Sequence, residues 1–145
     1  MPPIEDFIRG ISIGDIYWFV NPQINSLDPH PHVCLGILED NDCVFMLCGT
    51  SQFETKRRHF ELTGLPYETL VRIQPNHTNT IVRDTFVDCN DVQTHDVGDL
   101  YYNETLQQRG MVNDAELLQI RDGIEISDLL EQVTKNEILR MFPDL

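Results

Sequence analysis

The stretch VCLGILEDNDCVFMLC, residues 33–48, decides the fold class of this chain. Two apolar runs, 33–38 and 43–48, flank a polar link of four residues at 39–42. Four residues is a usual length for a hairpin loop, and each run has the length of a strand rather than of a helix. The stretch therefore predicts two adjacent antiparallel strands.

Further short strands are predicted on both sides of this pair. The run at 13–20 contains three consecutive aromatic residues at 17–19, and shorter apolar runs occupy 60–62, 70–73 and 85–89. Aromatic and β-branched residues between turn-forming residues are typical of strands. We expect the consecutive aromatic residues to pack in the core rather than to form a platform for nucleobases. Together these runs predict a small barrel of five to seven strands.

Helix signals are concentrated toward the C-terminus. Asn113 precedes Glu116 by three residues, which is the spacing of a helix N-cap. The side chain of such an N-cap residue accepts a hydrogen bond from a first-turn backbone amide that has no partner within the helix. A second helix is predicted to open at Ser127 and to end at Pro143. A short helix is also expected at 4–9, where two prolines precede it. The predicted fold class is thus mainly β with appended α-helices.

Length and composition bound the organisation of the chain. The 145 residues are 41% hydrophobic and 23% charged, which indicates a single domain over 1–145. We expect a barrel at about 11–97 and a helical region at about 98–142. The net charge of −14 repels nucleic-acid backbones at long range, so a general nucleic-acid coat protein is excluded and no DNA partner is predicted. No apolar run approaches a membrane span and no secretion signal is recognised, so a cytoplasmic protein without membrane contact is expected.

Several short motifs follow one another in a characteristic order. They are GDIYW at 14–18, PHVCL at 31–35, CGTSQ at 48–52, VDCNDVQT at 87–94 and GMV at 110–112. In order and spacing they resemble the MazF/PemK family of toxin proteins over roughly residues 13–122. The resemblance implies an SH3-like barrel with helices appended, and an unrelated α+β domain is the alternative.

The resemblance also implies an activity. Members of the family commonly cut single-stranded RNA without a metal or cofactor, by attack of a ribose 2′-hydroxyl on the neighbouring phosphate, and are neutralised by an antitoxin. For this chain the implied partners are single-stranded RNA, a cognate antitoxin protein and a second copy in a homodimer. The reaction needs a base, an acid and hydrogen-bond donors for the charge that grows on the phosphate.

The resemblance places the catalytic groups at His30, Thr50 and Ser51. Active relatives usually carry an arginine immediately before the proline that is Pro31 here, and His30 stands in its place. Histidine exchanges a proton near neutral pH but lacks the permanent two-pronged clamp of arginine. Thr50 and Ser51 correspond to hydroxyls that line the site in relatives, and a turn at the strand end is their alternative reading.

RNA contacts are expected from Gln52 and from the basic cluster of Lys56, Arg57 and Arg58. The resemblance puts this cluster in a loop beside the RNA groove, where it could hold a phosphate. Three positive charges on a solvated loop tip are equally ordinary.

Other residues oppose RNA cleavage. Asp88 and Asn90 occupy places where some relatives carry Arg and Asp, and Asp88 would repel RNA. Residues 84–99 hold five acids and neither Lys nor Arg. With His30 in place of arginine, these features leave a second function open, a catalytically silent binding or regulatory domain with a protein partner.

A metal site is a further alternative for one segment. His30, His32 and Cys34 alternate, so an extended chain would present all three on one face, where soft ligands could hold a metal. The four cysteines show no CxxC pair, and we expect them to be buried and reduced. No metal ligand is assigned.

Overall fold

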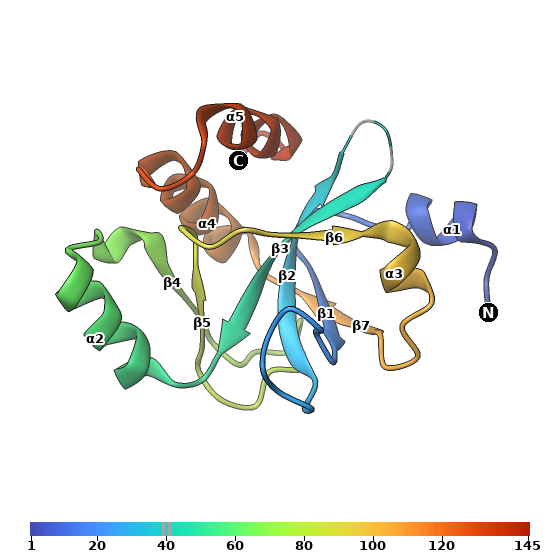
Figure 1. Ribbon diagram of the computed structural model, residues 1–145, viewed down its shortest axis with the longest axis horizontal. Coiled ribbons are helices and arrows are strands. Elements are labelled where there is room, and N and C mark those ends of the chain that lie inside the picture. Colours follow the sequence, from blue (N-terminus) through green and yellow to red (C-terminus); the bar gives the residue numbers. More distant parts are fainter. Residues whose placement is uncertain (39, 41) are drawn as a thin grey trace.

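The computed structural model describes residues 1–38, 40 and 42–145, and within these it is mainly β (Figure 1). The strands are β1 (Asp15–Phe19), β2 (His30–Ile37), β3 (Cys43–Thr50), β4 (Leu70–Ile73), β5 (Thr85–Asp88), β6 (Gln93–Asp96) and β7 (Gln107–Met111). The α-helices are α1 (Ile4–Arg9), α2 (Phe53–Thr63), α3 (Val97–Tyr101), α4 (Asp114–Ile126) and α5 (Gln132–Met141). All strand pairs are antiparallel, and the sheet curls into a half-barrel. The predicted fold class is confirmed.

The hairpin that decides the fold class is β2 with β3. Val33 lies opposite Leu47 in the register, and the Leu38 amide donates to the Cys43 carbonyl at 2.9 Å to close the ladder. Glu39 and Asn41, which belong to the predicted link, lie outside the described residues. The predicted runs at 13–20, 70–73 and 85–89 are likewise confirmed as β1, β4 and β5.

The sheet curls because β3 changes partner along its length. The order of the strands in the sheet is β4-β5-β3-β2-β1-β7, and β6 also pairs with β3. The first half of β3 pairs with β6, whereas Gly49 and Thr50 at its end pair with β5. An isolated bridge from Asn79 to Gly110 then ties the β4–β5 connection to β7. This end of the half-barrel is where the candidate site lies.

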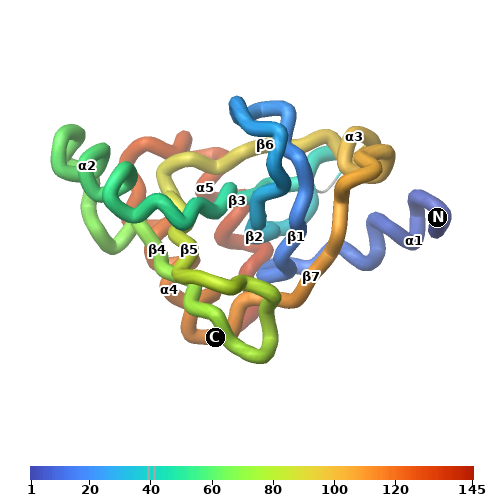
Figure 2. Tube along the Cα trace, turned by 90° about the horizontal axis from the view of Figure 1, so that it is seen from below, coloured from blue at the N-terminus to red at the C-terminus, as the bar shows by residue number. Residues whose placement is uncertain are grey.

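The central strands are buried on both faces, which explains their continuous apolar runs. On β3, Phe45 and Leu47 join the core covered by α4 and α5, while Val44 and Met46 face the core covered by α1 and α3. Side chains alternate between faces with a period of two, so each strand supplies both cores. Figures 1 and 2 show α1 and α2 at opposite ends of the molecule.

The predicted N-cap of the first C-terminal helix is confirmed. The Asn113 side chain accepts from the Glu116 amide at 2.7 Å, and the Glu116 carboxylate accepts from the Asn113 amide at 3.0 Å. The second helix begins at Gln132, so its predicted start at Ser127 is wrong. The Ser127 hydroxyl is buried and donates to the Asn90 side chain at 2.6 Å. Among the described residues, no helix is long and apolar enough to cross a membrane.

Two local predictions around the basic cluster are wrong. Residues 60–62 form part of helix α2 rather than a strand, and the basic cluster lies in the same helix rather than in a loop. Arg57 bonds Glu54 and Glu61 at helical spacings of three and four residues, and Gly64 ends the helix with a φ of 71°. Strand β7 was not predicted, because its sequence QQRGM has no apolar alternation.

Candidate functional site

One cleft gathers chemistry-bearing side chains from distant parts of the sequence. It has a volume of about 510 Å³ and lies among the β1–β2 loop, the end of β3 and the segment that enters β5. Its lining includes four of the seven predicted site residues, His30, Thr50, Ser51 and Gln52. Figure 1 shows the β1–β2 and β4–β5 loops at the same end of the sheet. This cleft is the candidate site.

The floor of the cleft depends on a glycine. Gly49 lies where β3 passes from β2 to β5, and a Cβ there would come within 2.6 Å of the Thr85 methyl group and 3.0 Å of the Pro31 carbonyl oxygen. Such distances are shorter than van der Waals contact, so only glycine lets the three segments approach this closely. The approach sets His30 and Thr50, the neighbours of Pro31 and Gly49, on the same cleft.

The half-buried His30 is held in a defined tautomer. Its Nδ1 lies 2.9 Å from the Asp28 carbonyl oxygen, which can only accept, so Nδ1 carries the proton of the neutral ring. Nε2 is then the acceptor. An oriented imidazole with an acceptor nitrogen on a cleft suits a general base.

The hydroxyl of Thr50 is oriented as a donor. Its Oγ1 accepts a hydrogen bond from the Gln52 amide at 3.1 Å, which leaves its own hydrogen to donate. Thr50 is half-buried at the end of β3, whereas Ser51 and Gln52 are exposed in the turn that follows. A donor at this position can meet a phosphate oxygen.

Arg83 supplies a cation that was not predicted. It lines the cleft just before β5, and its carbonyl oxygen accepts from the Thr85 hydroxyl at 3.2 Å. The neighbouring Asp84 is engaged elsewhere, in an ion pair with Arg72 at 3.1 Å. The sequence carried one signal for this residue, because Arg83 is the only Lys or Arg between Arg72 and Arg109.

The basic cluster is separate from the cleft. Lys56, Arg57 and Arg58 are not among the described residues that line it. Lys56 lies 3.9 Å from the buried carboxylate of Asp88, and Arg57 is bonded within α2 as described above. Arg58 is exposed on the same helix. The charges of Lys56 and Arg57 are therefore largely compensated inside the protein.

Asp88 and Asn90 face the interior, not the cleft. Asp88 is buried, and the Asn90 side chain donates to it at 2.9 Å and to the Thr69 hydroxyl at 2.7 Å. The same Asn90 side chain accepts from Ser127. These bonds fasten β5 to the segments before β4 and after α4, so the expected repulsion of RNA by Asp88 does not act in the cleft.

The three residues of the metal alternative do not form an open ligand set. His32 is 0% exposed, its Nδ1 bonds the His30 carbonyl oxygen at 2.8 Å, and its Nε2 lies 3.0 Å from the Asn21 amide nitrogen. Burial and the neighbouring His95 lower the pKa of His32 to about 3. Burial raises the pKa of the Cys34 thiol to about 12. Within the described part of the chain, no three His, Cys, Asp or Glu side chains gather as metal ligands.

The consecutive aromatic residues divide between core and cleft. Tyr17 and Phe19 are buried, as expected, whereas the half-buried Trp18 lines the cleft. Its indole nitrogen donates to the Thr80 hydroxyl at 3.2 Å, and the Arg109 guanidinium lies 5.7 Å from the ring centre. Trp18 thus adds an aromatic wall to the site.

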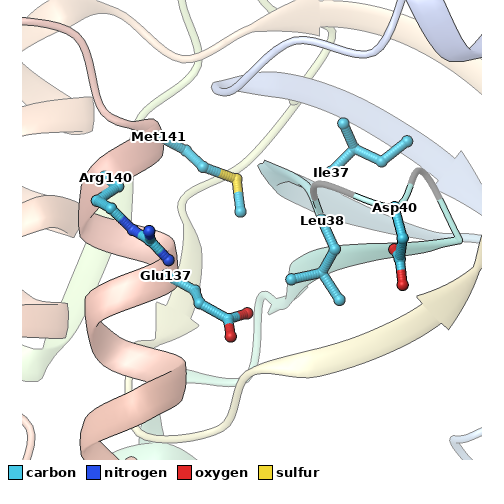
Figure 3. A pocket seen from close by; sticks show the side chains of 6 residues that line it. All are labelled: Ile37, Leu38, Asp40, Glu137, Arg140 and Met141. Atoms are coloured by element: carbon cyan, nitrogen blue, oxygen red, sulfur yellow. The ribbon is translucent and has the colours of Figure 1, made fainter.

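A second cleft of about 470 Å³ lies between α5 and the β2–β3 hairpin (Figure 3). Met141 and Glu137 extend from α5 toward Ile37 and Leu38 of the hairpin. None of the seven predicted site residues is among its described lining residues. It is not the candidate site.

No model of a known protein family matches the chain, and no curated protein matches it significantly.

Proposed function

We propose that this protein is a MazF/PemK-like endoribonuclease that cleaves single-stranded RNA in the cleft described above. The observation that carries the proposal is that His30, Thr50 and Arg83 line the same cleft. Attack on a phosphodiester by a neighbouring hydroxyl requires a base and donors for the growing negative charge, and His30 offers the base while Thr50 and Arg83 offer the donors. Arg83 supplies the cation that His30 does not.

The reaction follows from these groups. Nε2 of His30 takes the proton of the ribose 2′-hydroxyl, and the oxygen forms a bond to the adjacent phosphorus. The bond from phosphorus to the 5′-oxygen breaks, the 5′-oxygen takes a proton from water, and a 2′,3′-cyclic phosphate and a 5′-hydroxyl result. Thr50 and Arg83 donate to the phosphate oxygens, whose negative charge grows in the transition state. His30, Thr50 and Arg83 supply the base and the donors, and water supplies the proton for the leaving oxygen.

RNA binding in this protein has to overcome the net charge of −14. Because most of the acids lie outside the cleft, the local field at Arg83 governs contact with a phosphate, and the overall charge slows the encounter. We expect a short RNA site and tight neutralisation by a partner that covers the cleft. A cognate antitoxin and a homodimer belong to the same proposal, on the strength of the sequence resemblance.

The test is cleavage of a mixed-sequence RNA by the purified protein in the presence of EDTA. We expect cleavage that leaves 2′,3′-cyclic phosphate ends, slowed about 10²–10⁴-fold by His30→Ala. Arg83→Ala and Thr50→Ala should each slow it by up to about 10³-fold. His77→Ala, which removes an exposed histidine outside the cleft, is the matched control and should keep the full rate.

Two results would overturn the proposal. One is the absence of cleavage of any RNA by folded protein. The other is cleavage that persists in His30→Ala, Thr50→Ala and Arg83→Ala alike, since that activity would belong to another site or to a contaminant.

A second candidate function is a catalytically silent domain that binds a protein partner. The internal pairing of Lys56 with Asp88 and of Arg57 with Glu54 and Glu61 favours it, because these cations are not offered to RNA. Such a domain would leave RNA unbound even at low salt, where electrostatic attraction is greatest. A salt-sensitive shift of RNA on a native gel would contradict this candidate.

A further inference from the structure

A third pocket lies on the opposite face of β1 from the cleft, because Tyr17 and Trp18 point to opposite faces of that strand. It has a volume of about 720 Å³, opens to solvent, and is lined by residues of α1, α3, β1, β7 and the segments beside them. Its lining shares no residue with the cleft. Its lining includes Asp15 and Tyr17 of β1, Phe7 of α1 and Tyr101 of α3, the four side chains from which we argue its ligand.

The hydroxyl of Tyr17 is the first sign of a ligand. Tyr17 is only 4% exposed, and in the described part of the chain its phenol oxygen has no hydrogen-bond partner. Every fully enclosed side-chain oxygen or nitrogen there does have a partner, so this oxygen is reached from the pocket. A buried tyrosine hydroxyl normally finds a partner within the protein. Here the pocket supplies this partner, which is water or a polar group of a ligand.

Asp15 lies beside it on the same face of β1, two residues away. It is 8% exposed, and its Oδ2 accepts from the Ser12 amide at 3.2 Å. No cationic side chain pairs with it among the described residues. Burial raises the pKa of this carboxyl, which means that its surroundings in the protein disfavour its negative charge. A positive group in the pocket would relieve that cost.

The walls of the pocket are aromatic and acidic. The Phe7 and Tyr101 rings lie 5.5 Å apart and are tilted by 56°, and the Tyr101 hydroxyl donates to the Pro2 carbonyl oxygen, which fixes that ring. Glu104, Asp6 (which is paired with Arg9) and Met1 at the amino end also line the pocket, whereas no Lys or Arg is among its described lining residues. Aromatic faces and carboxylates together attract cations and repel anions.

We propose that this pocket binds a small organic cation, an ammonium or guanidinium group carried on an apolar body. The cationic head lies between the Asp15 carboxylate and the Tyr17 hydroxyl, and both accept its N–H groups. The apolar body lies against Phe7 and Tyr101. The pocket has room for a molecule of this kind.

The proposal is tested by titrating the purified protein with three probes of one shape and different charge. These are 2-phenylethylammonium, 2-phenylethanol and phenylacetate, with agmatine as a guanidinium probe, measured by calorimetry and by protein NMR shifts. We expect saturable binding of at least one cation, and no binding of the alcohol or the anion at the same concentration. The shifted resonances should come from α1, α3 and β1.

Variants locate the site. Asp15→Asn keeps an oxygen for the Ser12 amide and should weaken cation binding about 10–100-fold. Tyr17→Phe keeps the buried ring and should weaken cation binding about 2–10-fold. This second variant still tests the proposal if Asp15→Asn does not fold. The matched control is Asp128→Asn, which neutralises an exposed carboxylate outside the pocket, and it should change affinity less than about twofold.

Three results would overturn the proposal. These are equal binding of 2-phenylethanol and 2-phenylethylammonium, no saturable binding of either cation up to about 10 mM, and cation binding that Asp15→Asn and Tyr17→Phe leave unchanged. None of these variants touches the cleft, so the outcome is independent of RNA cleavage.

Discussion

His30 and His32 are two residues apart on β2, and the fold gives them opposite roles. His30 lies at the rim of the cleft, where its Nδ1 is fixed by a carbonyl oxygen and Nε2 is the acceptor. His32 is closed in the core, where both ring nitrogens are engaged and the ring stacks on Phe19 at 4.0 Å. The same side chain is thus accessible at the strand end and packed in the core two residues further on.

The difference teaches that enclosure, not residue type, decides which histidine can do chemistry. Buried His32 is held neutral by desolvation and by His95, so it cannot take a proton near neutral pH. Its bond to the His30 carbonyl oxygen instead holds the backbone from which His30 extends. The core histidine supports the rim histidine.

The largest expected effect separates the two histidines directly. His30→Gln should slow RNA cleavage about 10²–10⁴-fold and leave the free energy of unfolding unchanged within about 0.5 kcal/mol. His32→Gln should lower the free energy of unfolding by about 1–3 kcal/mol, because it breaks a buried hydrogen-bond network, and slow cleavage by less than about tenfold. Single-turnover cleavage and urea unfolding measure the two quantities. Similar activity losses in both variants would contradict the division of roles.

The next largest effect concerns the other end of β2. Gly36 has a φ of +111°, and a Cβ there would overlap the Met141 sulfur of α5. Gly36→Ala should lower the free energy of unfolding by about 2–4 kcal/mol, through backbone strain and displacement of α5. Urea unfolding measures this loss, and cleavage by the folded protein should persist because the cleft is remote. Gly64→Ala, also at positive φ but with open space around it, is the control that isolates strain from collision.

A smaller effect is the pH dependence that His32 imposes on stability. Its pKa in the folded protein, about 3, lies below that of an unfolded chain, so the unfolded state binds more protons as the pH falls. The free energy of unfolding should therefore decrease as the pH is lowered, by about 2 kcal/mol from pH 7 to pH 5 for His32 alone. His95, whose pKa burial also lowers, adds to the loss.

Urea unfolding at pH 7, 6 and 5 measures this dependence. His32→Gln should reduce the slope, while His77→Gln, which changes an exposed histidine, should leave it near that of the unaltered protein. An unchanged slope in His32→Gln would mean that other groups control stability in this range.

The smallest effect distinguishes the cation in the cleft from those on α2. Gel shifts with an uncleavable 2′-O-methyl RNA at several salt concentrations give the slope of affinity against salt. Arg83→Ala should reduce that slope by about one, the value for one lost phosphate contact, and Arg58→Ala should change it much less. A larger change for Arg58→Ala would place the RNA path along α2.

Prediction from the sequence succeeded where the local pattern and the tertiary environment agree. The hairpin at 33–48 and the capping box at Asn113 each rest on neighbouring residues, and both are confirmed. It failed at 60–62, where an apolar-polar-apolar triplet has the strand period but belongs to α2. The spacing of Glu54, Arg57 and Glu61 and the glycine at 64 were the signals that favoured a helix.

The candidate site was predictable only in part. His30, Thr50, Ser51 and Gln52 were singled out by the resemblance to MazF/PemK proteins, and all four line the cleft. Arg83 was missed, since nothing near it in sequence shows that the entry to β5 passes beside the end of β3. The pocket at Asp15 and Tyr17 was missed for the same reason, as helices from both sides of the sequence enclose it.

The sequence by itself determined the mainly β class, the central hairpin and the capped C-terminal helix, because hydrophobic period, turn chemistry and capping act over a few residues. Only the tertiary structure decided which histidine is open, which cations are already paired and which arginine joins the cleft. Burial and charge compensation depend on segments brought together by the curl of the sheet, and no local pattern records that approach. In this protein the curl of the sheet leaves His30 on the cleft and encloses His32 in the core.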